Sequence, residues 1–386
     1  MRVLVTGGAG FIGSRLVESL VRRGHAVKVI DSLNPQIHGN GIEIRQRLAH
    51  DPEWQNVIFE HADIRDHSAL ERLLPNTDAL VHLAAETGTG QSMYQIAHYY
   101  EVNVQATAAL LELIALKYRH LRRIVLASSR AVYGEGAYQT VDGALICPEP
   151  RAKERMTAGL FEPAGMQGES LALVATPESL QAKPASVYAA TKLANEQLGK
   201  IMADSHGLQV TALRLQNVYG AGQSLQNPYT GILSIFSNRM RGNLPINIFE
   251  DGRESRDFVH VSDVVRAMEL VLGAALTGFT VVNIGSGVPT SVMEVARLLR
   301  ELLRSSSDLR VSGDFRAGDI RHCYADLTRA RELLGFAPNI SIEQGLAEFC
   351  AWIAQQPVFT DQSEKALGEL ERHGLGRSTA APCPSR

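Results

Sequence analysis

The sequence has no apolar run long enough to cross a membrane or to form a secretory signal peptide. Cysteine is scarce as well, with four residues in 386, and no two of them form a C-x-x-C pair. This spacing disfavours a disulfide framework and favours reduced thiols, as in the cytoplasm. We therefore expect a cytoplasmic protein without a membrane segment.

The chain also lacks an excess of charge of one sign. Lys and Arg number 38 and Asp and Glu number 41, so the formal net charge is -3. This balance argues against a nucleic-acid surface or a polybasic membrane anchor, although a few well-placed arginines suffice to bind a small anion. No internal repeat is found. The 45% of hydrophobic and 20% of charged residues are ordinary for a globular protein of one large or two medium domains.

The first third of the chain alternates short apolar runs with helical patterns. Buried strands are predicted at residues 3–6, 26–30, 57–61, 79–83 and 124–127. Helices are predicted at 15–23, 69–74, 100–118 and 188–205, and a further strand at 210–214. Nearly all-apolar strands separated by helices are typical of βαβ units, because a parallel sheet is buried on both faces. We predict an α/β fold with a Rossmann-type, doubly wound parallel sheet.

The pattern divides the chain into three parts. Residues 1–216 form the Rossmann domain, interrupted at about 138–183 by an insert that is rich in Gly, Pro and Glu and has no clear period. Residues 217–357 form a smaller, mixed α/β lobe, from which the chain can return to the sheet. Residues 358–386 form a C-terminal tail, expected to be partly disordered because its end is rich in Gly, Ser and Pro.

A glycine-rich turn follows the first strand and precedes the first helix. Its predicted cofactor-binding residues are Gly7, Gly10, Phe11, Ile12 and Gly13. Glycines at this spacing allow a tight turn, so that backbone and a helix N-terminus can approach a pyrophosphate. The alternative is a glycine-rich turn without a ligand.

An acidic residue stands where a dinucleotide-binding fold needs one. Asp31 ends the second strand, and its carboxylate can accept hydrogen bonds from both ribose hydroxyls of the adenosine. It would repel a 2′-phosphate, and no Arg follows within residues 32–37. The sequence therefore favours NAD over NADP and disfavours a turn without a ligand.

Two further segments follow strands that end at the ligand-binding edge of such a sheet. Asp63 and Ile64 follow the third strand and are expected near the adenine, with a solvated loop acid as the alternative. Leu83, Ala84 and Ala85 end the fourth strand, where small residues allow backbone contact with a cofactor. Alanines that serve only packing would give the same pattern.

Tyr188 and Lys192 lie four residues apart, on one face of a predicted helix. A nearby ammonium and a positive nicotinamide ring lower the pKa of a phenol, which makes Tyr188 a candidate base for a sugar hydroxyl. Ser129 ends the fifth strand at the same sheet edge and can hydrogen-bond the same hydroxyl. Such a Tyr-x-x-x-Lys pair can also be a solvent-exposed pair without a function. The preceding dinucleotide motif disfavours this alternative.

From Met1 to about Pro357, the chain resembles the extended short-chain dehydrogenase/reductase family, specifically its nucleotide-sugar epimerases and dehydratases. The resemblance is carried by the segments 6–13, 82–85, 128–134, 188–192, 214–220 and 256–261. It implies that Ser129, Tyr188 and Lys192 are catalytic and that Asn103, Tyr188 and Lys192 contact NAD. It implies a nucleotide-sugar substrate bound by Glu86, Thr87, Asn217, Arg256 and Arg321, with a plain surface arginine as the alternative for Arg321. It also implies a homodimer formed by the helices at 100–118 and 188–205, whose apolar residues could equally be internal core.

Two departures from the family pattern narrow the chemistry. Family dehydratases carry Thr-Asp-Glu where this chain has Ser129, Arg130 and Ala131, and these residues cannot supply the acid and base for water elimination. The segments 86–93 and 227–231, and the 59-residue step from Ser129 to Tyr188, resemble a subgroup of dTDP-L-rhamnose 4-epimerases. The insert of that subgroup often carries cysteine pairs suited to zinc. Here only Cys147 is present, so no metal is expected.

These observations predict an NAD-dependent 4-epimerase of a nucleoside diphosphate hexose, which acts through a transient 4-keto sugar. dTDP-L-rhamnose and dTDP-6-deoxy-L-talose are candidate substrates. A net nucleotide-sugar reductase or dehydrogenase would use the same residues and is the first alternative. A catalytically silent NAD-binding regulator is the second, and the intact Ser129, Tyr188 and Lys192 speak against it.

Overall fold

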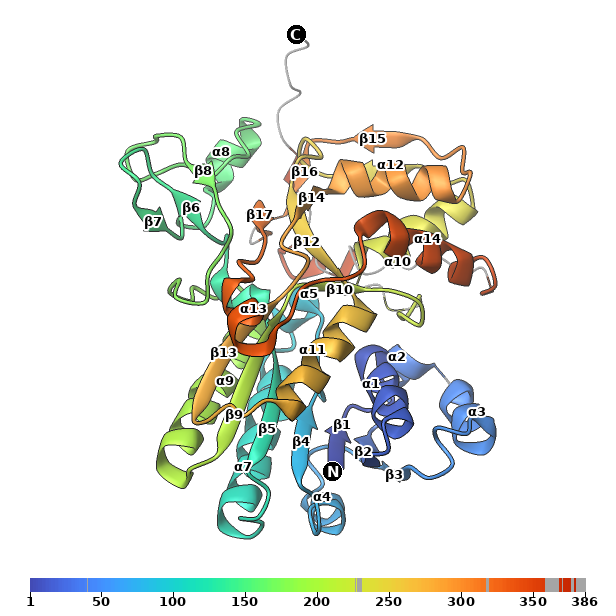
Figure 1. The fold of residues 1–386 in the computed structure, drawn as a ribbon. Coiled ribbons are helices and arrows are strands. Elements are labelled where there is room, and N and C mark those ends of the chain that lie inside the picture. The colour runs from blue at the N-terminus through green and yellow to red at the C-terminus, as the bar shows by residue number, and fades with distance from the viewer. Residues whose placement is uncertain are drawn as a thin grey trace.

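A parallel sheet of seven strands organises the chain in the computed structural model (Figure 1), which describes residues 1–39, 41–225, 227, 231–316, 319–357, 368–369, 371–375 and 378–379. The strand order is β13-β9-β5-β4-β1-β2-β3, and every pairing in it is parallel. The strands are β1 (Arg2–Thr6), β2 (Ala26–Asp31), β3 (Ile58–His61), β4 (Ala79–His82), β5 (Arg123–Ser129), β9 (Gln209–Leu215) and β13 (Phe279–Ile284). The predicted Rossmann-type fold is confirmed.

Helices cover both faces of this sheet, because successive strand side chains point to opposite sides. In β1, Val3 and Val5 belong to the core shared with α1 (Phe11–Arg22) and α11 (Val261–Gly273), whereas Leu4 belongs to the core shared with α7 (Ala106–Leu116). The second face also carries α4 (His67–Leu73), the π-helix η1 (Glu101–Gln105) and α9 (Val187–His206). Further helices are α2 (Pro35–His38), α3 (Ile42–His50), α5 (Thr89–Ser92), α6 (Ile96–Tyr100) and α13 (Thr328–Leu334).

A second, smaller lobe follows β9 and has its own apolar core. Its strand β12 (Ser255–His260) pairs with β10 (Asn217–Tyr219), β14 (Pro289–Ser291) and β17 (His322–Cys323), and β11 (Ile246–Ile248) pairs with β15 (Leu309–Val311). The helices of this lobe are α10 (Ile232–Arg241), α12 (Val292–Leu302) and α14 (Ile342–Ile353). Between β12 and β14 the chain returns through β13 to the edge of the large sheet.

The insert contains more regular structure than its composition indicates. Strand β6 (Tyr138–Gln139) pairs antiparallel with both β7 (Leu145–Ile146) and β8 (Ala172–Leu173), and α8 (Lys153–Thr157) lies between the last two. Strands of two residues leave no alternation to read, which is why the sequence shows no period here. Figure 1 places the insert beside the second lobe, at the upper left.

Most of the predicted C-terminal tail, 358–386, lies outside the described residues. Within it, β18 (Ser378–Thr379) pairs antiparallel with β16 (Asp314–Phe315). None of the helices that the structure describes is both long and apolar enough to span a bilayer.

Candidate active site

A cavity of about 560 Å³ lies at the carboxyl edge of the parallel sheet. Its wall combines the glycine-rich turn, the carboxyl ends of β2, β3, β4, β5 and β9, and the start of α9. Most residues that the sequence singled out line this cavity together: Gly7, Gly10, Phe11, Ile12, Gly13, Asp31, Asp63, Ile64, Leu83, Ala84, Ala85, Glu86, Thr87, Ser129, Tyr188 and Lys192. The remaining four lie outside its wall: Asn103, Asn217, Arg256 and Arg321.

The glycine-rich turn brings backbone to the cavity at points where a side chain has no room. Gly7 has a φ of +67°, and a Cβ there would lie 2.8 Å from the Ala84 nitrogen. A Cβ on Gly13 would lie 2.2 Å from the Gly7 carbonyl oxygen. Helix α1 begins directly after Gly10 without a side-chain cap, so its first amides are left to bind an anion such as a pyrophosphate.

Asp31 ends β2 beside this turn and is held by two backbone amides. The amides of Ala9 and Leu33 donate to its carboxylate at 3.0 and 2.9 Å, and His38 Nε2 lies 3.5 Å away. The side chain is buried and lines the cavity. A carboxylate fixed in this way suits ribose hydroxyls and repels a 2′-phosphate, so the turn and Asp31 together fit NAD.

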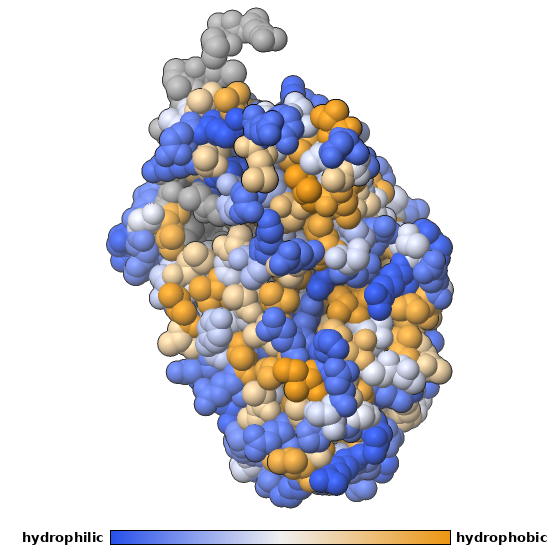
Figure 2. All heavy atoms as spheres, turned by 90° about the vertical axis from the view of Figure 1, so that its left-hand side faces the viewer, coloured by the Kyte–Doolittle hydropathy of each residue, from blue (hydrophilic) through white to orange (hydrophobic). Residues whose placement is uncertain are grey.

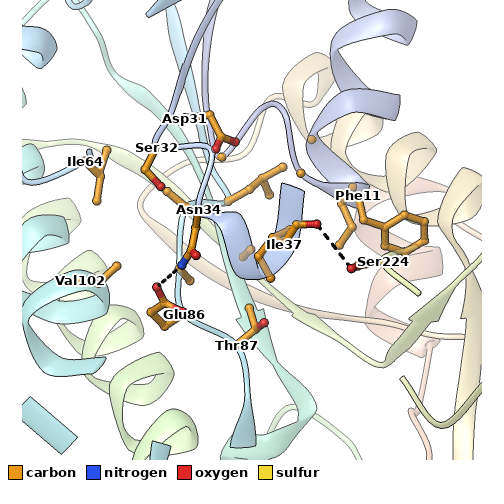
Figure 3. A pocket seen from close by; sticks show the side chains of 18 of the residues that line it. Phe11, Asp31, Ser32, Asn34, Ile37, Ile64, Glu86, Thr87, Val102 and Ser224 are labelled. Atoms are coloured by element: carbon orange, nitrogen blue, oxygen red, sulfur yellow. Dashed lines mark hydrogen bonds between the residues drawn. The ribbon is translucent and has the colours of Figure 1, made fainter. Parts of the chain in front are cut away.

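Residues 34–38, which we call the strap, form a wall that the sequence did not indicate (Figure 3). Asn34 Nδ2 donates to Glu86 Oε1 at 3.2 Å, and Ser224 Oγ donates to the Ile37 carbonyl at 3.4 Å. The strap therefore joins the chain after β4 to the chain after β10 across the cavity.

Asp63 reaches the cavity as one half of an ion pair. The Arg65 guanidinium donates two hydrogen bonds of 2.9 Å to its carboxylate and holds the pKa of Asp63 below its usual value. Ile64 lines the cavity next to it. Contact of these two residues with the adenine stays a prediction.

Asn103 is completely buried behind the wall rather than in it. Its amide oxygen accepts a hydrogen bond from the Glu86 nitrogen at 2.8 Å, and its amide nitrogen donates to the Glu86 carbonyl and to Thr191 Oγ1, both at 3.0 Å. These contacts tie the loop after β4 to α9. The structure therefore gives Asn103 a supporting position behind the wall, and its direct contact with NAD stays a prediction.

The three predicted catalytic residues meet at one part of the cavity. Ser129 ends β5, and Tyr188 lies in the first turn of α9, where its backbone amide donates to Ser92 Oγ at 3.0 Å. Lys192 is buried, and its Nζ lies 5.8 Å from the Tyr188 ring centroid and donates to the Ala127 carbonyl at 2.9 Å. A helical spacing of four thus places the ammonium beside the phenol, as the sequence predicts.

The pKa values of this group are dominated by burial. Burial raises the pKa of Tyr188, while a hydrogen bond from Ser129 and the charge of Arg130 act in the opposite direction. Burial also lowers the pKa of Lys192 to about 8. The predicted lowering of the phenol pKa by Lys192 together with the nicotinamide ring stays a prediction. The charge of Arg130, to which the sequence assigned no role, opposes the rise.

The predicted substrate residues Asn217 and Arg256 lie just beyond the cavity wall. Asn217 Oδ1 accepts a hydrogen bond from Arg130 Nε at 2.9 Å. The Arg256 guanidinium donates to the carbonyls of Ser255, Ile320 and Arg321 at 2.8, 2.8 and 3.0 Å. No carboxylate in the described ranges pairs with Arg256, so its charge is available to an anionic ligand.

Arg321 is where the structure departs most from the sequence-based expectation. Its side chain is 0% exposed and pairs with Glu162 at 2.6 Å, Asp251 at 2.7 Å and Glu250 at 2.8 Å. The guanidinium is thus occupied by carboxylates of the insert and of the second lobe, and it does not line the cavity. Pairing with three carboxylates favours a structural role for Arg321, and its contact with substrate phosphates stays a prediction.

Gln216 is a cavity residue that the sequence-based reasoning missed, although it lies inside a matched segment. It follows β9, lines the cavity and is almost completely buried. Both of its side-chain amide atoms lack a hydrogen-bond partner among the residues that the structure describes. An amide in this state is costly, and a bound ligand or water would satisfy it.

Potential metal ligands are not clustered. Within the described residues, no group of three or more His, Cys, Asp or Glu side chains could hold a metal ion. Residues 228–230 of the segment that resembles the rhamnose epimerase subgroup lie outside the described part of the chain.

The sequence and the fold define the class of protein. The sequence model of the NAD dependent epimerase/dehydratase family matches residues 3–151 and 164–285, and the chain belongs to this family. It is 39% identical over 357 residues to a dTDP-L-rhamnose 4-epimerase of Burkholderia thailandensis, covering 92% of this chain and 95% of that protein. It is 31% identical over 351 residues to a UDP-glucose 4-epimerase of Mycolicibacterium smegmatis, covering 90% and 97%.

Solved structures show the same architecture. The UDP-glucose 4-epimerase of Thermotoga maritima with UDP-glucose superposes with a TM-score of 0.72 at 29% identity, covering 92% of this chain and 99% of that one. The UDP-glucuronic acid 4-epimerase of Bacillus cereus with UDP-glucuronic acid and NAD gives a TM-score of 0.73 at 26% identity, with the same coverage. The chain is therefore similar throughout the sheet and the second lobe to enzymes that bind NAD and nucleotide sugars.

Proposed function

We propose that the protein is an NAD-dependent nucleotide-sugar 4-epimerase that acts through a transient 4-keto sugar. One observation carries the proposal: Ser129, Tyr188 and Lys192 meet in the cavity that the glycine-rich turn and Asp31 also line. The dTDP-L-rhamnose and dTDP-6-deoxy-L-talose pair is the proposed substrate pair, supported by the identity of 39% with the Burkholderia enzyme.

Each residue of the catalytic group has a distinct task in this proposal. Ser129 donates a hydrogen bond to the sugar 4-oxygen, and Tyr188 accepts the proton of the 4-hydroxyl and later returns it. Lys192 keeps the phenol oriented and favours its anionic form. NAD, held by the glycine-rich turn and Asp31, would supply the hydride acceptor for C4 and the hydride donor for the resulting ketone. Arg256 and Asn217 hold the nucleotide end while the sugar turns over.

Replacement of Tyr188 with phenylalanine tests the proposal. Wild-type protein incubated with dTDP-L-rhamnose, UDP-glucose or UDP-glucuronic acid, without added reduced cofactor, should invert one carbon of at least one sugar by NMR. The Tyr188→Phe variant should lose this turnover by at least about a thousandfold and still bind NAD, because only the proton acceptor is removed. Stoichiometric change in cofactor absorbance would instead favour the reductase or dehydrogenase, and binding of NAD without any turnover would favour a regulator.

We also propose a homodimer formed through the helical segment 100–118, which contains η1 and α7, and through α9. Apolar side chains on these helices are about half exposed, with Tyr100 at 42%, Leu116 at 58% and Ile201 at 59%. The side of the molecule that carries α9 and the insert shows apolar side chains between hydrophilic ones (Figure 2). An Ile201→Lys variant should shift the mass in light scattering from dimer to monomer, and an unchanged mass would exclude this interface.

We also propose a cytoplasmic location, which the state of the cysteines supports. Cys147, Cys323 and Cys350 are free thiols in the described chain, and unpaired thiols are typical of a reducing compartment.

A further inference from the structure

Arg130 is half-buried and, like Arg256, has no carboxylate partner among the described residues, in contrast to three other arginines. Arg151, Arg214 and Arg321 each form ion pairs of 3.0 Å or shorter with glutamate or aspartate side chains. Arg130 makes a single hydrogen bond, from its Nε to Asn217 at 2.9 Å. Its two terminal nitrogens contact no acceptor in the part of the chain that the structure describes.

The position of Arg130 connects it to the reacting group. It directly follows Ser129 and begins the short 3-10 helix η2 (Arg130–Tyr133), which packs against α9 near Tyr188. The charged or titratable groups that face Arg130 include Arg256, Asp319, Cys323 and Tyr188. Asp319 is the only carboxylate among these four, and it lies 3.7 Å from another arginine, Arg316.

A half-buried guanidinium without a carboxylate partner is costly, because desolvation and the neighbouring Arg256 both oppose its charge. These two effects lower the pKa of Arg130 only to about 10, so it stays charged at neutral pH. Of the groups that face it, Tyr188 is the one that gains and loses a proton in the proposed reaction. A desolvated charge that is kept without a carboxylate partner is typical of a functional site.

We propose that Arg130 is a positioning residue for catalysis, which acts through Tyr188 by placing a second fixed positive charge, held by Asn217, beside the base. This inference rests on the proposed function. The groups that face Tyr188 are Lys192 on α9, Ser129 on β5, Arg130 on η2 and Tyr99 on α6. Two of these four are cations, and Lys192, with its pKa of about 8, loses charge as the pH rises while Arg130 keeps it.

The experiment is the pH profile of kcat for wild type, Arg130→Gln and Arg130→Lys. Glutamine can still donate to Asn217 but carries no charge, so we expect the acidic limb to move up by about one pH unit. The Arg130→Lys variant keeps a positive charge, so its acidic limb should lie close to that of the wild type. Arg300→Met, an exposed residue at the end of α12, is the matched control and should leave the profile unchanged.

Two results would overturn the inference. In the first result, kcat of the Arg130→Gln variant falls by the same factor at every pH, and the acidic limb of its pH profile does not move. In the second, the Kd for UDP rises as much as kcat/KM falls, which would make Arg130 a phosphate ligand. Failure of the proposed function is separately visible, because no nucleotide sugar would then turn over. In that case, ultraviolet titration of the Tyr188 phenol in the NAD complex, with Tyr188→Phe as the blank, tests the same shift without turnover.

Discussion

Replacement of Arg321 with methionine tests whether this arginine holds the insert on the second lobe. Its side chain is 0% exposed and its guanidinium pairs with Glu162 from the insert and with Glu250 and Asp251 from the lobe. Methionine keeps much of the apolar length of the side chain and removes the charge. The three carboxylates, of which only Glu250 is buried, then lose their shared partner.

The expected magnitude follows from the burial of each pair. Removing one partner of a buried ion pair costs about 3–5 kcal/mol. Glu250 keeps its ion pair with Arg151 at 2.9 Å, and Glu162 is 60% exposed, so its pair adds at most about 1 kcal/mol. We therefore expect the free energy of unfolding to fall by about 3 kcal/mol and the Tm to fall by roughly 4 °C.

The assay is urea unfolding combined with thermal denaturation of the full chain. Arg310→Met is the control, because Arg310 pairs with Asp308 at a similar distance of 2.7 Å but both side chains are more than 60% exposed. That variant should lose at most about 1 kcal/mol.

Equal losses in the two variants would refute the structural role of Arg321. A normal Tm combined with weakened binding of UDP would instead support the phosphate contact that the sequence resemblance implies.

The pH dependence of stability gives a further check, through the ion pair of Arg321 with Glu162. Arg321 and His322 lower its pKa to about 2, so its share of the stability should be present above about pH 4.5 and disappear as the pH falls toward 2.

Three other predictions follow from single contacts. Gly13→Ala should abolish NAD binding by calorimetry, because its Cβ would lie 2.2 Å from the Gly7 carbonyl oxygen, and retained affinity would contradict the proposed turn. Ser224→Ala removes the hydrogen bond to the strap at Ile37 and should speed NAD release by about threefold to tenfold in stopped flow, whereas an unchanged rate would mean that the strap does not retain the cofactor. Glu254→Gln should stabilise the protein by roughly 1–3 kcal/mol at pH 8 but not at pH 4.5. Burial raises the pKa of Glu254 to about 7, so the folded state loses stability as the pH rises from about 4.5 through 7, and a gain at both pH values would exclude this cause.

The sheet and the glycine-rich turn could be predicted because their signals are local. Each predicted strand overlaps an observed one, since short apolar runs bounded by helical patterns have few other ways to bury both faces. The turn could be recognised because Gly7, Gly10 and Gly13 stand between a strand and a helix. The pair of Tyr188 and Lys192 follows from helical spacing alone.

The insert and the strap lacked such signals. Strands β6, β7 and β8 have two residues each, and their pairing partners lie up to 35 positions apart, so neither alternation nor turn chemistry marks them. The strap consists of Asn34 and the four-residue helix α2, and its position is fixed by a contact with Ser224, 187 positions from Ile37.

The sequence by itself determined the parallel sheet, the preference for NAD and the juxtaposition of Tyr188 and Lys192, because periodicity, glycine spacing and a helical repeat act over a few residues. Only the tertiary structure decided which charges are free to act. Glu250 and Glu162 lie 71 and 159 positions from Arg321 and neutralise it, while Arg130 meets no carboxylate in the described chain. The pairing of a charge is set by the three-dimensional path of distant segments, and no local pattern in the sequence records that path.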